Sequence, residues 1–126
     1  MFNEGELIFS YSRKQAIEDG VLVEVSSVAK QVGSRYPVAV TRVLWDSWIV
    51  PDEGARRLGE TEQGRLWDLL WVLHSVIKRQ QPEGDRLFFS VLFTKEGKKQ
   101  LVRLKSICGP GDNLDPVVTI MLPEED

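Results

Sequence analysis

The stretch LWDLLWVLHSVI, residues 66–77, places an apolar side chain at every third or fourth position. This spacing predicts an amphipathic helix over about residues 62–80, because residues three and four apart share one helix face. Thr61 can cap its first turn. We expect two adjacent rows to form a face broad enough for a central core helix. These rows consist of Leu66, Leu70, Leu73 and Ile77, and of Trp67, Trp71 and His74.

Downstream of this helix the apolar residues recur at every second position, which is the period of a β-strand. Strands are expected at residues 86–94, 100–108 and 117–122. The first is largely apolar on both faces and is therefore expected to be central in its sheet. In the second, Arg103 and Lys105 face away from the apolar side chains, which indicates one solvated side. A hairpin loop at 95–99 and a Pro-Gly turn at 109–112 connect the strands.

Upstream of the long helix, capping residues, glycines and prolines divide the chain into shorter elements. We expect a helix at 13–19, an extended segment at 21–25, a helix from Ser26 or Ser27 to Gly33, a three-turn helix after Pro37 and a loop at 51–60. The helix after Pro37 is inferred from the spacing between Val40 and Trp48, with Thr41 as a competing cap. The four tryptophans are expected in the core, although not all four rings need to face inward and Trp45 lies off the main stripe of its helix.

These elements predict an α+β fold. N-terminal helices would pack on one face of a small antiparallel β-sheet, formed by a C-terminal three-stranded meander. A chain of 126 residues fits a single domain. Within it we expect a mainly helical half at residues 1–85, the β-meander at 86–122 and an acidic tail at 123–126.

Composition narrows the function by exclusion. The net charge of −3 lacks the basic excess that is usual in proteins that bind the DNA backbone. Cys108 is the single cysteine, so no intrachain disulfide can form, and a cytoplasmic location is expected. The acidic N-terminus does not resemble a secretory signal, and no apolar run reaches the roughly 18 residues that span a bilayer. We therefore expect no membrane partner.

Gly109, Gly111 and Asp112 form one candidate binding site. Glycines next to an acidic residue can turn backbone amides toward a phosphate or carboxylate. Tyr11 and Arg13, beside the first short helix, could hold the same group. The alternative is that the Pro-Gly segment is an ordinary type II turn and that these two side chains lie on a solvated surface.

A second candidate site is the basic segment 95–105, which has a net charge of +4 over eleven residues. Its candidate binding residues are Lys98, Lys99, Arg103 and Lys105. Such a segment can contact nucleic acid or an acidic protein surface. Lysines also protect a sheet edge against aggregation, which is the alternative interpretation. Aromatic residues interleaved with the basic ones, as a base-stacking platform needs, are missing from this segment.

The sequence shows no group of residues with the spacing that a catalytic site needs. His74, the only histidine, is expected beside tryptophans on an apolar helix face, as a partly buried side chain. Cys108 is expected at a strand end on the apolar side, where cysteine behaves as a small hydrophobic residue. No spacing such as HxxxH or CxxC supports a metal site. We therefore assign no catalytic residue, no metal and no cofactor, and an enzyme is not favoured.

Several segments carry a resemblance to a known family. They are YSRKQAIEDGVLV (11–23), YPVAVT (36–41), GRLWD (64–68), CGPGD (108–112) and PVVTIMLPE (116–124). They resemble a family of small uncharacterised bacterial proteins whose members commonly sit on plasmids, integrative elements and phage-like regions. The resemblance implies an accessory role on a mobile element, and it implies no reaction.

We therefore expect a non-enzymatic binding protein that acts by protein–protein interaction, as an accessory or counter-defence factor of a mobile element. Its partner would be a host protein or an element-encoded protein, and the sequence assigns no oligomeric state. One alternative is a small enzyme or a nucleotide- or phosphate-binding protein that uses the loop 109–113 with Tyr11, Arg13 and His74. The other is a nucleic-acid binder that uses the hairpin 95–105.

Overall fold

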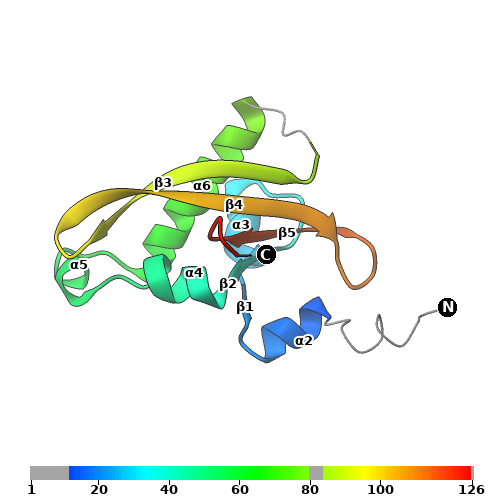
Figure 1. The fold of residues 1–126 in the computed structure, drawn as a ribbon, viewed down its shortest axis with the longest axis horizontal. Helices are drawn as coiled ribbons and strands as arrows, with labels where there is room; N and C mark the ends of the chain where they lie inside the picture. The colour runs from blue at the N-terminus through cyan, green and yellow to red at the C-terminus, as the bar shows by residue number, and fades with distance from the viewer. Residues whose placement is uncertain (1–11, 80–83, 126) are drawn as a thin grey trace.

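The computed structural model describes residues 12–79 and 84–125. Its elements are α2 (Arg13–Glu18), β1 (Leu22–Glu24), α3 (Ser26–Val32), β2 (Val38–Thr41), α4 (Arg42–Leu44), the π-helical turn η1 (Trp45–Ile49), α5 (Glu53–Arg57), α6 (Glu62–Arg79), β3 (Arg86–Lys95), β4 (Lys98–Pro110) and β5 (Pro116–Met121). Figure 1 shows a twisted sheet with the long helix α6 lying across one of its faces. Neither described range contains a helix that is long and apolar enough to cross a membrane.

The sheet has five strands in the order β1-β2-β5-β4-β3. Strands β3, β4 and β5 form the antiparallel meander that the sequence predicts. Strand β5 also pairs in parallel with β2, and β1 pairs with β2 in the antiparallel direction. The fold is therefore α+β, as predicted, but the sheet is mixed and takes two further strands from the N-terminal half.

One face of the sheet, here called the inner face, packs against α6 and α3 and forms the core. Successive side chains of a strand point to opposite faces, so every second residue of β3 reaches this core. These residues are Leu87, Phe89, Val91 and Phe93, and all are buried. Leu69 of α6, Leu104 of β4 and Ile120 of β5 have no exposed surface. The opposite face of the sheet is called the outer face below.

Local capping signals largely agree with the structure. The Ser12 hydroxyl accepts a hydrogen bond from the Gln15 amide at 3.0 Å, and Thr61 does the same for Gly64 at the start of α6. Gly33 has a φ of 116° and ends α3, as expected. The predicted cap of α3 is wrong, because the Ser26 hydroxyl instead accepts from the Val38 amide at 2.9 Å.

The buried face of α6 contains Leu66, Leu70 and Leu73 of the predicted leucine row, but it does not contain the predicted tryptophan row. Trp71 is 55% exposed, and Trp67 and Ile77 are also exposed, so the core placement of Trp67 and Trp71 is wrong, whereas Trp45 and Trp48 pack against the core. The helix instead turns Leu69 toward the sheet, and Arg65, four residues earlier on the same side, becomes buried. The Arg65 guanidinium donates to the carbonyls of Trp48 and Thr94 at 2.8 and 2.7 Å and to Glu60 at 3.0 Å. These partners let a charged side chain occupy a core position.

The helix predicted after Pro37 begins later than expected. Residues 38–41 form strand β2, because they pair with both β1 and β5 and bury Val38, Ala39 and Val40. The competing cap is correct, since the Thr41 hydroxyl accepts from the Leu44 amide at the start of α4. The loop predicted at 51–60 contains the short helix α5, which Asp52 caps. Here long-range strand pairing outweighs the local helical spacing.

Strand β3 was predicted to be central, but it lies at the edge of the sheet. Its second apolar row, Phe88 and Leu92, is consequently exposed. The predicted Pro-Gly turn is also displaced: Pro110 ends β4, and the chain turns at 112–113, where the Leu114 amide donates to the Gly111 carbonyl. Cys108 was expected on the apolar side, yet it is exposed near the end of β4.

Candidate functional site

The outer face of β3 and β4 carries large apolar side chains in the open. Phe88 is 42% exposed, Leu92 57% and Leu101 71%. The strand register places Leu92 directly opposite Leu101, so their side chains are neighbours on this face. Clustered apolar exposure of this kind marks interaction sites more often than scattered single residues do. We call this region the β3–β4 outer face.

Basic residues share the β3–β4 outer face with these apolar residues. Arg86, Lys99 and Arg103 occupy outward-facing positions of the two strands. The Arg103 guanidinium lies over the Phe88 ring, 4.7 Å from its centroid. None of the outward-facing positions of β3 and β4 is Asp or Glu. The surface is therefore apolar at its centre and positively charged around it.

Strand β3 also offers unpaired backbone groups. Within the described residues it pairs with β4 on one side only. The Cys108 amide donates to the Asp85 carbonyl, so the odd-numbered residues of β3 face β4 with their backbone groups. The N–H and C=O groups of Phe88, Ser90 and Leu92 therefore point to the free edge. An extended segment from another chain could pair there.

The hairpin cations are distributed differently from the prediction. Lys105 is only 2% exposed, because its ammonium group donates to the carbonyls of Pro123 and Glu125 in the C-terminal segment. Lys98 alternates to the inner side of β4, and Lys95 lies over the Trp48 ring at 4.6 Å. Lys105 shares the outer side of β4 with Arg103, as predicted, but is covered there, so Lys99 and Arg103 are the candidate cations of this hairpin that are exposed on the β3–β4 outer face.

Arg13 and Asp112, far apart in the sequence, do come together. The two carboxylate oxygens of Asp112 accept from the amides of Arg13 and Lys14 at 2.8 and 2.9 Å. These backbone hydrogen bonds hold the pKa of Asp112 below its usual value. The Arg13 guanidinium donates to the Thr119 hydroxyl at 2.7 Å and to the Val118 carbonyl at 2.8 Å. Both charged groups therefore join α2 to the sheet.

Gly109 and Gly111 of the predicted loop site line one open cavity together with Arg13 and Asp112, whereas His74 does not line it. Tyr11 lies outside the described residues, and Gly109 is part of β4. Gly111 packs closely: a Cβ there would come within 2.8 Å of a Val117 methyl group. His74 lies beside Val118, on the inner face of β5, whereas Arg13 binds the side chain of the next residue on the outer face. The sheet thus separates His74 from Arg13 and Asp112.

Sequence reasoning missed the apolar residues of the β3–β4 outer face. The sequence does show apolar residues on both faces of the strand at 86–94. This pattern occurs in central strands and also in edge strands that have an exposed binding face. It also missed an aromatic partner for the basic residues, since Phe88 comes from the neighbouring strand and not from the basic segment itself.

The comparisons with known proteins give a family and no activity. Over residues 1–126 the chain matches the model described as a family of unknown function, DUF6573, and it belongs to that family. This confirms the resemblance to an uncharacterised family along the whole chain. No curated protein and no solved structure matches the chain.

Proposed function

For this member of the DUF6573 family, we propose a non-enzymatic role as a protein-binding module that acts through the β3–β4 outer face. The partner is a protein that presents an extended segment with apolar side chains and carboxylates. Its backbone adds to the free edge of β3, and its side chains cover Phe88, Leu92 and Leu101. Binding blocks the surface of that partner. In this way the protein serves a mobile element as an accessory or counter-defence factor.

The observation that supports this proposal is the exposed apolar centre beside an unpaired strand edge. Covering Leu101, which is 71% exposed, would remove apolar surface from water and give affinity. The surrounding Lys99 and Arg103, without an acidic neighbour on these strands, favour a partner that carries carboxylates. Edge-strand backbone groups supply hydrogen bonds that do not depend on the partner's side chains.

Nucleic acid fits this face less well than protein. A base-stacking platform needs open aromatic faces, and the guanidinium of Arg103 already covers one side of the Phe88 ring. Lys105 is buried, so one expected phosphate contact is lost. The aliphatic side chains of Leu92 and Leu101 suit a protein partner.

The test is an affinity experiment with paired leucine variants. The immobilised chain is incubated with nuclease-treated bacterial lysate at low salt, and bound proteins are quantified by mass spectrometry. Leu101→Asp places a charge in the centre of the face and should reduce recovery of the partner at least tenfold. Leu58→Asp is the matched control, since Leu58 is 80% exposed and follows α5, outside β3 and β4.

The proposal predicts a protein that binds wild type and Leu58→Asp but not Leu101→Asp. This result supports the proposal when the same protein also binds in purified form. Equal recovery with both variants contradicts it. A signal that disappears on nuclease treatment contradicts it in favour of nucleic acid. Light scattering that shows a dimer of wild type, lost in Leu101→Asp, contradicts it in favour of a second copy of the chain.

A further inference from the structure

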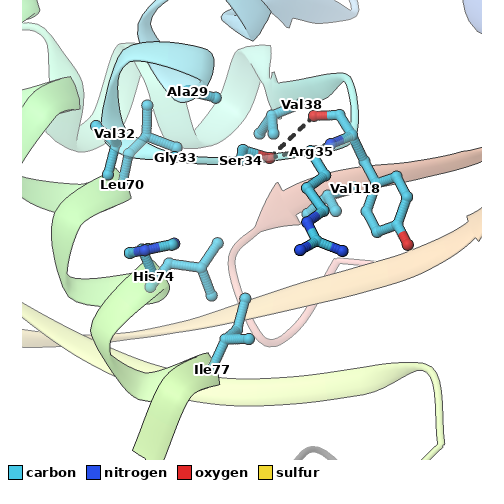
Figure 2. A pocket seen from close by; sticks show the side chains of 12 residues that line it. Ala29, Val32, Gly33, Ser34, Arg35, Val38, Leu70, His74, Ile77 and Val118 are labelled. Carbon is cyan, nitrogen blue, oxygen red and sulfur yellow. Dashed lines mark hydrogen bonds between the residues drawn. The ribbon is translucent and has the colours of Figure 1, made fainter.

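A cavity lies on the inner side of the sheet, away from the β3–β4 outer face. It opens between α3, the segment 33–36 that follows it, α6 and β5, and has a volume of about 230 Å³ (Figure 2). Its walls are aliphatic and come from Val32, Val38, Leu70, Leu73, Ile77 and Val118. Aliphatic walls of this kind favour an apolar ligand over water.

Two polar side chains, Arg35 and His74, line this cavity, and His74 also has a tilted ring contact with Trp71. Figure 2 shows the Arg35 guanidinium extending over the aliphatic wall and the His74 ring on the α6 side. Among the residues that the structure describes, none forms an ion pair or hydrogen bond with either side chain. The lining contains no Asp or Glu, and the Ser34 hydroxyl is engaged with the Tyr36 carbonyl at 3.0 Å. The cavity is thus apolar inside and cationic at its mouth.

The end of α3 positions the His74 ring. Gly33 has a φ of 116°, and a Cβ at this residue would come within 3.1 Å of His74 Cε1. The absence of a side chain therefore lets the imidazole lie against the backbone, where one of its nitrogens can donate to a ligand in the mouth. Gly33 therefore both ends α3 and leaves room for the His74 ring at the cavity.

We propose that this cavity binds a small anionic amphiphile: a monocarboxylate with a short aliphatic chain or a single ring. The apolar body fills the space between α3 and α6, and the carboxylate is bound by Arg35, with His74 as a second donor. Cavities of about 150 Å³ with aliphatic walls already accept benzene, so 230 Å³ accommodates a body of this size. Guanidinium and carboxylate form two parallel hydrogen bonds, which selects the anion.

The test compares three ligands of the same chain length: octanoate, octan-1-ol and octylammonium. Binding to the full chain is followed by amide and methyl chemical shifts in NMR titrations at neutral pH. Octanoate should bind at least tenfold more tightly than octan-1-ol, and octylammonium should bind most weakly. The shifts should be localised at α3, the segment 33–36 and α6. Equal affinities of octanoate and octan-1-ol, or no binding of octanoate at millimolar concentration, would overturn the proposal.

Variants distinguish the anion site from simple apolar binding. Arg35→Glu, at an exposed position, should abolish the preference for octanoate and leave octan-1-ol binding unchanged. Ile77→Trp, at the partly exposed mouth, should weaken both ligands by filling the space. Lys30→Glu is the matched charge control, because Lys30 is exposed on α3 and does not line the cavity. A loss of octanoate binding in Lys30→Glu equal to that in Arg35→Glu would contradict a local contact. Since the proposed partner surface is on the other side of the sheet, Leu101→Asp should bind octanoate normally.

Discussion

At the scale of single residues, Asp112 shows how a charged side chain becomes a structural one. Both of its oxygens accept backbone amides at the first turn of α2, 98 and 99 positions away in the sequence. A carboxylate at this place satisfies amides that no helical carbonyl reaches and interacts favourably with the helix dipole. The contact that would have suggested a phosphate site is thus explained by the attachment of α2.

Asp112→Ala should destabilise the chain in a pH-dependent way. The pKa of Asp112 is lowered in the folded state, so its stabilising effect is complete above the unfolded pKa of roughly 4 and is lost as the pH falls through the lower folded value. Urea unfolding should therefore separate wild type from Asp112→Ala at pH 7 and bring the two together toward pH 2. Asp115→Ala, a nearby exposed carboxylate, is the control. Equal separation of Asp112→Ala from wild type at both pH values would contradict the assignment.

At the scale of elements, the rotation of α6 decides which apolar residues form the core. The helix has more apolar residues than one buried face can hold, so two candidate faces exist. Packing on the sheet buries Leu69 and Arg65 together with the predicted Leu66, Leu70 and Leu73, and Arg65 reaches the carbonyls of η1 and β3 from this side. Trp71 is consequently left at the surface.

Leu69→Ala and Trp71→Ala should therefore differ strongly in stability, although tryptophan is the larger side chain. Leu69 has no exposed surface, so its truncation leaves a cavity and should cost about 3 kcal/mol in the free energy of unfolding. Trp71 is 55% exposed, and its truncation should cost less than about 1 kcal/mol. Chemical denaturation measures both values. A larger loss for Trp71→Ala would mean that the helix is rotated so that the tryptophan row is buried.

At the scale of the whole molecule, β5 joins the two halves of the chain. It lies between β2 and β4, with Val38 paired to Val118 and Lys105 paired to Met121. The C-terminal segment adds to this connection, since the Glu125 carboxylate accepts from the Thr41 hydroxyl at 2.8 Å. In the described part of residues 1–85, strands β1 and β2 thus connect to the rest of the sheet through β5.

A fragment of residues 1–85 should not fold by itself. Its strand β2 would expose the edge that β5 covers, and α6 would lose the inner face that buries Leu69. We expect poor amide dispersion in NMR and no cooperative thermal transition for this fragment, against a single transition for the full chain. A cooperative transition in the fragment would show that the first 85 residues form an independent unit.

The sequence by itself determined the features that depend on neighbours along the chain. Thr61 begins α6, Gly33 ends α3, and the period of two beyond residue 86 yields the β3–β4 hairpin. The same alternation puts Lys99 and Arg103 on one side of β4. The sequence determines these features because each pattern depends on residues only a few positions apart.

Only the tertiary structure decided which patterned surfaces are covered. The strand at 38–41, the edge position of β3, the burial of Lys105 and the meeting of Arg13 with Asp112 all require contacts between distant segments. Local preferences at these positions are worth a fraction of the energy gained by pairing strands and burying side chains, so they do not set the outcome. The β3–β4 outer face arises for this reason: an apolar pattern suited to a central strand stays open because no strand of the described chain pairs beyond β3.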